Sequence, residues 1–246
     1  METVYKRSSA LTERQFSYCP GCTHGIAHRL IAELLEEMDL IGETIAVGCV
    51  GCAAPARFFF NVDFCRSMHG RGPAEATGVK RMNPNKLVFT YQGDGDFISI
   101  GTAETVHAAN RGEKFTSIFI NNATFGMTGG QMAPTPLVGQ YSTTSQDGRK
   151  EELVGKPIRA VEMLATLEGC KFAERVSLDS PAAVRNAKRA IKRAFECQLK
   201  GLGYSVVEIL STCPSNWHLS PKECTQFIRD EMIPYYPIAN FKDFED

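Results

Sequence analysis

The sequence lacks long hydrophobic runs and has almost no charge imbalance. No stretch approaches the roughly 18 apolar residues that cross a bilayer, and Met1 to Arg7 do not form the apolar segment of a signal peptide. The 246 residues carry 27 basic and 28 acidic side chains, and a formal net charge of −1 gives no general attraction for nucleic acid. We therefore expect a cytoplasmic protein that binds neither membrane nor nucleic acid.

Repeats, low-complexity tracts and flexible linkers are also missing, but cysteine is abundant. Nine cysteines are present, and their odd number argues against a fully paired disulfide framework. Because the cytosol keeps thiols reduced, a cysteine-rich cytosolic protein more often binds a metal or performs redox chemistry. The composition therefore raises the question of a metal site.

Periodic segments alternate along the chain. Helical spacing of apolar residues is followed by short apolar runs that are typical of strands buried on both faces. This alternation predicts an α/β fold, an open and mostly parallel sheet with helices on both faces, whose ligands bind beyond the carboxyl ends of the strands. The expected helices are 26–38, 103–109 and 181–201, and the expected strands are 44–47, 87–91, 117–120 and 204–210.

Polar and sulfur-bearing side chains follow four of these predicted strands. They comprise Cys49 and Cys52, the turn Gly93 to Asp96, the pair Asn121-Asn122, and Cys213. Because parallel strands end at the same edge of a sheet, we expect these groups to gather there.

The turn Gly93-Asp94-Gly95-Asp96 is a candidate cation site. Its glycines allow a ligand to approach the backbone, and a carboxylate is a hard oxygen ligand suited to Mg²⁺. Residues 96–120, 25 positions, separate Gly95 from Asn121 and leave room for one helix and one strand. Since Asp-Gly is also a common turn dipeptide, two unrelated turns remain an alternative.

The Gly-Asp-Gly turn and the distant Asn-Asn pair together resemble the thiamine diphosphate binding motif. The resemblance implies that Asp94 and Asn122 bind Mg²⁺ through their side chains and Thr124 through its carbonyl group, with the diphosphate as the remaining ligand.

Four further segments resemble the beta subunit of 2-oxoacid:ferredoxin oxidoreductases, over about Cys19 to Ser215. They are Cys19-Pro20-Gly21-Cys22, Val50-Gly51-Cys52, His69-Gly70-Arg71-Gly72-Pro73 with Ala76-Thr77-Gly78, and Phe125 to Gln131. The resemblance implies a single thiamine diphosphate-binding domain over 1–246, whose terminal segments contribute cysteines to one [4Fe-4S] cluster. The implied cluster ligands are Cys19, Cys22, Cys52 and Cys213. The implied cofactor-binding residues are Val50, Gly51, Cys52, Ala53, His69, Gly93, Asp94, Gly95, Asp96, Asn122, Gly126, Met127 and Thr128.

Four thiolates suit either an iron–sulfur cluster or Zn²⁺, and sequence spacing does not separate them. The thiamine motif favours the cluster, because oxidative chemistry needs a one-electron acceptor and zinc has no redox states. Cys49 is a rival for Cys52 because it lies three residues earlier. The other cysteines are expected to be small buried apolar residues.

Three residues are candidates for contact with the reacting groups. His69 is expected to contact diphosphate or substrate, with a packing role as the alternative. Arg71 matches a substrate carboxylate, or braces a neighbouring loop. Met127 is expected to position the thiazolium ring. His24, His28 and His107 receive no catalytic role, because lone helical histidines are more often satisfied or solvated.

The resemblance implies an oxidoreductase of anaerobic metabolism. Its reaction is the oxidative decarboxylation of a 2-oxoacid with coenzyme A, and the electrons pass to ferredoxin. A branched-chain substrate such as 2-oxoisovalerate and 2-oxoglutarate are both open, and the small Gly129 favours the apolar substrate. In this family the glutamate that activates thiamine comes from an alpha subunit, so we expect a hetero-oligomer with alpha, gamma and ferredoxin-like delta subunits. The alternatives are a non-oxidative thiamine diphosphate decarboxylase or synthase and a non-enzymatic zinc scaffold.

Overall fold

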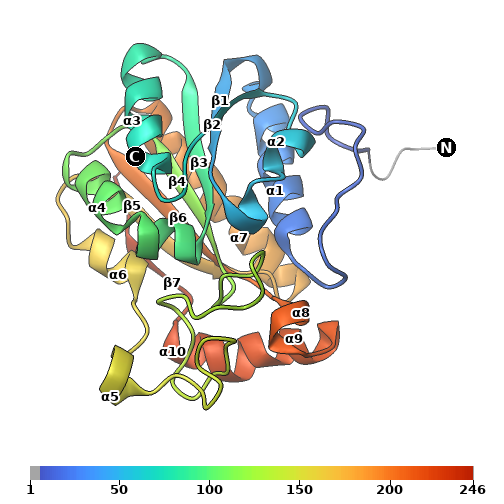
Figure 1. Ribbon diagram of the computed structural model, residues 1–246. Coiled ribbons are helices and arrows are strands. Elements are labelled where there is room, and N and C mark those ends of the chain that lie inside the picture. Colours follow the sequence, from blue (N-terminus) through green and yellow to red (C-terminus); the bar gives the residue numbers. More distant parts are fainter. Residues whose placement is uncertain (1–5, 246) are drawn as a thin grey trace.

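Across residues 6–245, which the computed structural model describes, seven strands form one sheet in the order β2-β1-β3-β4-β6-β5-β7 (Figure 1). The strands run parallel to one another except β7, which pairs antiparallel with β5. Their bounds are β1 Thr44–Gly48, β2 Asp63–Arg66, β3 Leu87–Gly93, β4 Thr116–Asn121, β5 Cys170–Ser177, β6 Tyr204–Leu210 and β7 Ala239–Lys242.

Helices cover both faces of this sheet, which confirms the predicted fold class. Helices α1 and α7 cover one face, and α3, α4 and α6 cover the other. Short helices near the carboxyl-terminal end of the chain form a separate layer below the sheet in Figure 1. No helix within residues 6–245 is long and apolar enough to cross a membrane. The bounds are α1 His24–Glu37, α2 Ala56–Phe59, α3 Gly72–Met82, α4 Thr102–Asn110, α5 Glu151–Val154, α6 Ala160–Ala165, α7 Pro181–Leu199, α8 Pro214–Trp217, α9 Pro221–Phe227 and α10 Ile233–Tyr235.

The central strands are buried on both faces and carry apolar side chains on each face. In β3, Phe89 packs in the core under α1 and α7, whereas Val88 packs in the core under α3, α4 and α6. Phe119 of β4 belongs to the second core, where it stacks on Phe97 with 4.3 Å between ring centroids. Buried polar side chains inside these strands bond to one another, as the Thr90 hydroxyl does to the Ser117 hydroxyl at 2.9 Å, so the polar groups that could meet a ligand lie at the strand ends.

The order of the strands opens a crevice between β1 and β3. After β1 the chain moves outward to β2, and it returns through α3 to β3 on the other side of β1. The loops that follow β1 and β3 therefore diverge, and such a switch point is the usual ligand site of an open α/β sheet.

The strands and helices predicted from periodicity correspond to β1, β3, β4, β6, α1, α4 and α7. The start of α7 is confirmed in detail, because the Ser180 side chain accepts a hydrogen bond from the backbone N–H of Ala183. Periodicity did not predict β5, since Glu174 and Arg175 interrupt its apolar pattern. Both residues are buried in ion pairs, which periodicity does not reveal.

The segment from Gly139 to Lys150 forms a closed loop. The backbone N–H of Gly139 donates to the Arg149 carbonyl at 2.8 Å, and the Arg149 N–H donates to the Gln140 carbonyl at 3.0 Å. The buried Arg149 guanidinium donates to the carbonyl groups of residues 133 and 154–156. These bonds order the loop from within.

Gln198 of α7 completes the hydrogen bonding of β3. Its amide oxygen accepts from the backbone N–H of Val88 at 2.6 Å, and its amide nitrogen donates to the Val88 carbonyl at 2.8 Å. Gln198→Met keeps the length of the side chain but removes both hydrogen bonds to the buried backbone groups of Val88. We expect the free energy of unfolding to fall by about 2–4 kcal/mol, measured by urea denaturation.

The matched control for this substitution is Leu199→Met, because Leu199 is 46% exposed and adjacent in the chain. Its effect should stay within about 0.5 kcal/mol. Equal stability of the two variants would contradict the bridging role of Gln198.

Candidate functional site

A pocket lies at the carboxyl ends of β1, β3 and β4. Most residues predicted to bind the cofactor line it, and two residues without a predicted role, His24 and Phe125, complete the wall. The predicted residues in the lining are Val50, Gly51, Cys52, His69, Gly93, Asp94, Gly95, Asp96, Asn122, Thr124, Gly126, Met127 and Thr128.

Three oxygen atoms converge in this pocket. The side-chain amide oxygen of Asn122 lies 3.2 Å from Oδ1 of Asp94 and 2.9 Å from the carbonyl oxygen of Thr124. Ligands about 2.1 Å from an octahedral Mg²⁺ ion are separated by about 3 Å along each edge. The three oxygens therefore have the spacing of Mg²⁺ ligands, and without a cation a rotated Asn122 amide would donate to both neighbouring oxygens.

Asp94 is buried, and its partners are a hydroxyl and a backbone amide. Thr135 Oγ1 donates to Oδ2, and the Gly95 N–H donates to Oδ1 at 2.9 Å. Burial raises the pKa of Asp94 to about 7, although both hydrogen bonds act in the opposite direction. A bound cation would favour the ionised carboxylate, so the donor set and its surroundings fit Mg²⁺.

Asp96 holds His69 at the rim of the pocket. One of its carboxylate oxygens accepts from His69 Nδ1 and from the Gly70 N–H at 2.8 Å, and the other accepts from Gln92 Nε2 at 2.6 Å. The His69 side chain is 32% exposed, and its ring meets the Phe125 ring edge-on. Protein donors thus occupy the Asp96 carboxylate, which orients the imidazole.

Two other predicted site residues lie away from this pocket. Arg71 pairs with Glu104 of α4 and lines a separate groove beside α3. Ala53 is fully buried in the core. This arrangement favours the bracing alternative for Arg71, and substrate contact by Arg71 stays a prediction.

A second cavity, of about 290 Å³, brings together the four predicted cluster cysteines, Cys19, Cys22, Cys52 and Cys213. Cys49 lies elsewhere, since its sulfur sits against Gly72 and is 2% exposed. The fold therefore places Cys52, and not Cys49, beside the other three thiols.

Hydrogen bonds draw the distant cysteine loops together. The Thr212 hydroxyl donates to the Gly21 carbonyl at 2.6 Å, and the Thr23 and Ser211 hydroxyls lie 2.6 Å apart. Gly21 has a φ of +82°, and a Cβ there would lie 2.6 Å from Pro221. The tight turn of Cys-Pro-Gly-Cys consequently packs against the loop after β6.

Burial favours the protonated thiols in this cavity, whereas a bound metal would favour the thiolates. Burial raises the pKa of Cys22 to about 11 and of Cys52 to about 12, and neighbouring cysteines contribute to both shifts in the same direction. Among residues 6–245, no group of three or more His, Cys, Asp or Glu side chains is arranged to hold one metal ion. In a [4Fe-4S] cluster each thiolate binds a different iron, so its ligands lie farther apart than those of one Zn²⁺ ion.

The two cavities share a wall. Gly126 lies between them, because a Cβ at this position would be 3.3 Å from Cys52 Sγ and 3.5 Å from Cys213 Sγ. Any group in the first pocket would thus lie next to any group held by the thiols. The residues common to both linings are His24, Cys52, Asn122, Gly126 and Met127.

Sequence reasoning missed several polar residues in this wall or beside it. His24 is buried, binds the Tyr91 hydroxyl through Nδ1 at 2.8 Å, and has its pKa lowered to about 3 by burial. Asn216 donates to Cys213 Sγ at 3.2 Å, and Trp217 donates to the Asn122 carbonyl at 3.1 Å. Proximity to Cys22 and Cys213 could have identified His24 and Asn216, whereas Thr135 has no signal in the sequence.

Position 95 requires glycine because a larger side chain would not fit there, and not because its backbone conformation excludes other residues. Its φ of −64° and ψ of −33° suit any residue, but a Cβ would lie 2.2 Å from the Phe125 ring.

Gly95→Ala should lower the free energy of unfolding of the metal-free protein by about 1–3 kcal/mol. Gly93→Ala is the control within the same turn, because no atom lies within 4 Å of its added Cβ. A loss as large in Gly93→Ala, measured by urea denaturation, would refute the steric explanation.

Comparison with known proteins places the chain in a family. Residues 41–209 match the thiamine pyrophosphate enzyme, C-terminal TPP binding domain. The ketoisovalerate oxidoreductase subunit VorA of Methanothermobacter marburgensis is 43% identical over 99% of this chain, which spans 51% of that relative's length. The 2-oxoglutarate synthase subunit KorB of Archaeoglobus fulgidus is 30% identical over 87% of this chain, which spans 75% of that relative's length. The subunit KorB of Methanothermobacter thermautotrophicus is 33% identical over 88% of this chain, which spans 73% of its length.

A solved structure shares the fold. The 2-oxoglutarate:ferredoxin oxidoreductase from Magnetococcus marinus superimposes with a TM-score of 0.82 over 99% of this chain and 87% of its own, at 22% identity. The identities and the matched domain confirm the resemblance seen in the motifs. The chain belongs to the thiamine pyrophosphate enzyme family and, within it, to the 2-oxoacid:ferredoxin oxidoreductase subunits that carry the thiamine pyrophosphate-binding domain.

Proposed function

We propose that this chain binds thiamine diphosphate with Mg²⁺ and a [4Fe-4S] cluster, and that it serves in the coenzyme A-dependent oxidative decarboxylation of a 2-oxoacid with ferredoxin as electron acceptor. One observation carries the proposal: the pocket with three converging oxygens shares the Gly126 wall with the cavity of four thiols. A non-oxidative thiamine enzyme would have no use for the second cavity.

The residues of the chain have separable roles in this proposal. Asp94, Asn122 and Thr124 would hold the Mg²⁺ ion and through it the diphosphate. When bound, thiamine diphosphate supplies the carbanion-stabilising chemistry of decarboxylation, and an iron–sulfur cluster accepts single electrons.

The walls of the pocket complete these roles. Met127 and Gly126 would pack against the cofactor, and His69, oriented by Asp96, would offer its free ring nitrogen at the rim. Cys19, Cys22, Cys52 and Cys213 would hold the cluster, and Asn216 would donate a hydrogen bond to one of its thiolates.

A branched-chain 2-oxoacid is the favoured substrate. The relatives named for ketoisovalerate are more similar to this chain than those named for 2-oxoglutarate. Gly129 leaves open space at the pocket's flank and brings no charge that would pair with a second carboxylate. 2-Oxoglutarate is the second candidate.

Partner subunits are part of the proposal. The chain spans about half the length of the ketoisovalerate relatives that it matches. Its pocket holds the diphosphate end of the cofactor, so we propose that an alpha subunit provides the aminopyrimidine end and the activating glutamate. Gamma and ferredoxin-like delta subunits would complete the assembly.

The proposal is tested by assaying the assembled protein without oxygen. Ferredoxin reduction should require coenzyme A and a 2-oxoacid, with 2-oxoisovalerate preferred to 2-oxoglutarate. Asp94→Asn should lower the rate by about 100-fold or more, because it removes a cation ligand. CO₂ release without electron transfer would support a non-oxidative decarboxylase, and the absence of any turnover of 2-oxoacids would refute the proposed activity.

Cysteine substitutions separate the cluster from its rivals. Cys52→Ser should remove most of the iron and sulfide from protein purified anaerobically, whereas Cys49→Ser, the matched control, should retain both, since only Cys52 lies beside the other thiols. Metal analysis and electron paramagnetic resonance after dithionite reduction give the measurement. Iron loss in Cys49→Ser alone would reverse the assignment, and stoichiometric zinc without iron would favour a zinc site.

A further inference from the structure

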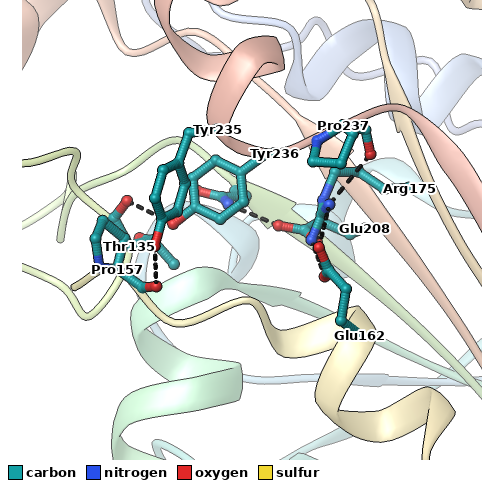
Figure 2. Close-up of polar contacts among 9 residues, drawn as sticks. Thr135, Pro157, Glu162, Arg175, Glu208, Tyr235, Tyr236 and Pro237 are labelled. Carbon is teal, nitrogen blue, oxygen red and sulfur yellow. Dashed lines mark hydrogen bonds and ion pairs between the residues drawn. The ribbon is translucent and has the colours of Figure 1, made fainter.

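A buried arginine lies behind the proposed cation site. Arg175 of β5 has no exposed side-chain surface. Its Nε donates to Glu208 at 2.7 Å, and Nη1 donates to Glu162 at 2.9 Å and to the Pro237 carbonyl at 3.2 Å (Figure 2). A fully buried charge is costly unless it is paired in this way. These contacts fix the arginine, and two chains of contacts lead from it toward the pocket.

The first chain of contacts runs through Glu208 to the loop after β4. Asn121 Nδ2 donates to Glu208 Oε1 at 2.6 Å, and Asn121 Oδ1 accepts from the backbone N–H of Ala123 at 3.1 Å. Ala123 has a φ of +53°, a left-handed conformation that is unfavourable for residues other than glycine. Asn121 thus braces the turn that directs Asn122 and Thr124 toward Asp94.

The second chain of contacts runs through Tyr236 to Asp94 itself. The Tyr236 ring centre lies 5.1 Å from the Arg175 guanidinium carbon, and the Tyr236 hydroxyl donates to the Thr135 carbonyl at 2.8 Å. The Thr135 hydroxyl in turn donates to Asp94 Oδ2. This bond engages one carboxylate oxygen and leaves Oδ1 facing Asn122.

We propose that Arg175, Glu208 and Tyr236 are positioning residues for the cation site, acting through Asn121 on one side and Thr135 on the other. This inference rests on the proposed function, because it assumes that the three oxygens bind Mg²⁺. When the Asn122 amide oxygen faces Asp94 and Thr124, as it must to bind a cation, the three oxygens repel one another, whereas a rotated amide would donate to both neighbours. Hydrogen bonds from behind are therefore needed to hold them at the spacing of an octahedral ion.

The chain provides a matched control at the neighbouring position. The Tyr235 hydroxyl donates to the Pro157 carbonyl at 2.8 Å, as the Tyr236 hydroxyl does to the Thr135 carbonyl (Figure 2). Pro157 does not line the pocket. Tyr235→Phe and Tyr236→Phe therefore delete the same kind of bond, and only the second deletion touches the path to Asp94.

The experiment measures Mg²⁺ affinity by isothermal titration calorimetry on the assembled, metal-stripped protein with thiamine diphosphate present. Thr135→Val should weaken Mg²⁺ binding about tenfold and Tyr236→Phe about threefold or more, whereas Tyr235→Phe should stay within about twofold of the parent protein. In the Thr135→Val background, Tyr236→Phe should add little, because its path runs through Thr135.

Melting temperatures without Mg²⁺ separate positioning from stability, since both tyrosine variants should lose a similar amount. Glu208→Gln, which keeps the shape of the side chain, is the second variant and should also weaken Mg²⁺ binding. Equal Mg²⁺ affinities of Tyr236→Phe and Tyr235→Phe would overturn this inference while leaving the cation site in place. Failure of the parent protein to bind Mg²⁺ and thiamine diphosphate would instead overturn the proposed function and this inference with it.

Discussion

The parallel pairing of β1, β3, β4 and β6 is the constraint on which the rest of the molecule depends. Parallel strands are buried on both faces, so their side chains must be apolar along nearly the whole length. Polar chemistry is thereby confined to the loops where the strands end, and all of these ends lie at one edge. Cys52 and Cys213 meet there with Asp94 and Asn122, although 160 residues, 53–212, separate the two cysteines in the chain.

The exceptions to an apolar sheet interior are informative. Glu174 and Arg175 of β5 and Glu208 of β6 are buried charged residues within strands. The cost of burying Arg175 and Glu208 is offset by their 2.7 Å ion pair and by the 2.6 Å hydrogen bond from Asn121 to Glu208, and Glu174 pairs with Arg189 at 3.3 Å. A buried pair of this kind is weak support for stability, but its hydrogen bonds are directional, and the contacts of Asn121 and Tyr236 extend from it to the loop after β4 and to Thr135.

Periodicity predicted the sheet and its central strands, and the motif resemblance predicted most of the residues that line the pocket at the carboxyl ends of these strands. They succeeded because the central strands and α7 have strong local patterns, and because loop residues that follow parallel strands must lie close together. They did not predict β2 and β5, whose charged residues break the apolar pattern, or the placement of Arg71 with Glu104. His24 was also missed, because its position on a helix gives no sign that it reaches the pocket. Its neutral imidazole forms part of the wall between the two cavities.

The amino-acid sequence by itself determined the fold class, the family, and the residue types available at the strand ends, because these follow from local apolar patterns and short motifs. Tertiary structure placed Cys52, and not Cys49, beside the other three thiols, set Gly126 as the wall between the cavities, and brought Thr135 to Asp94. Each of these depends on distances between segments far apart in the chain. Such distances arise only when both faces of the sheet are packed, since packing sets where every loop begins and ends.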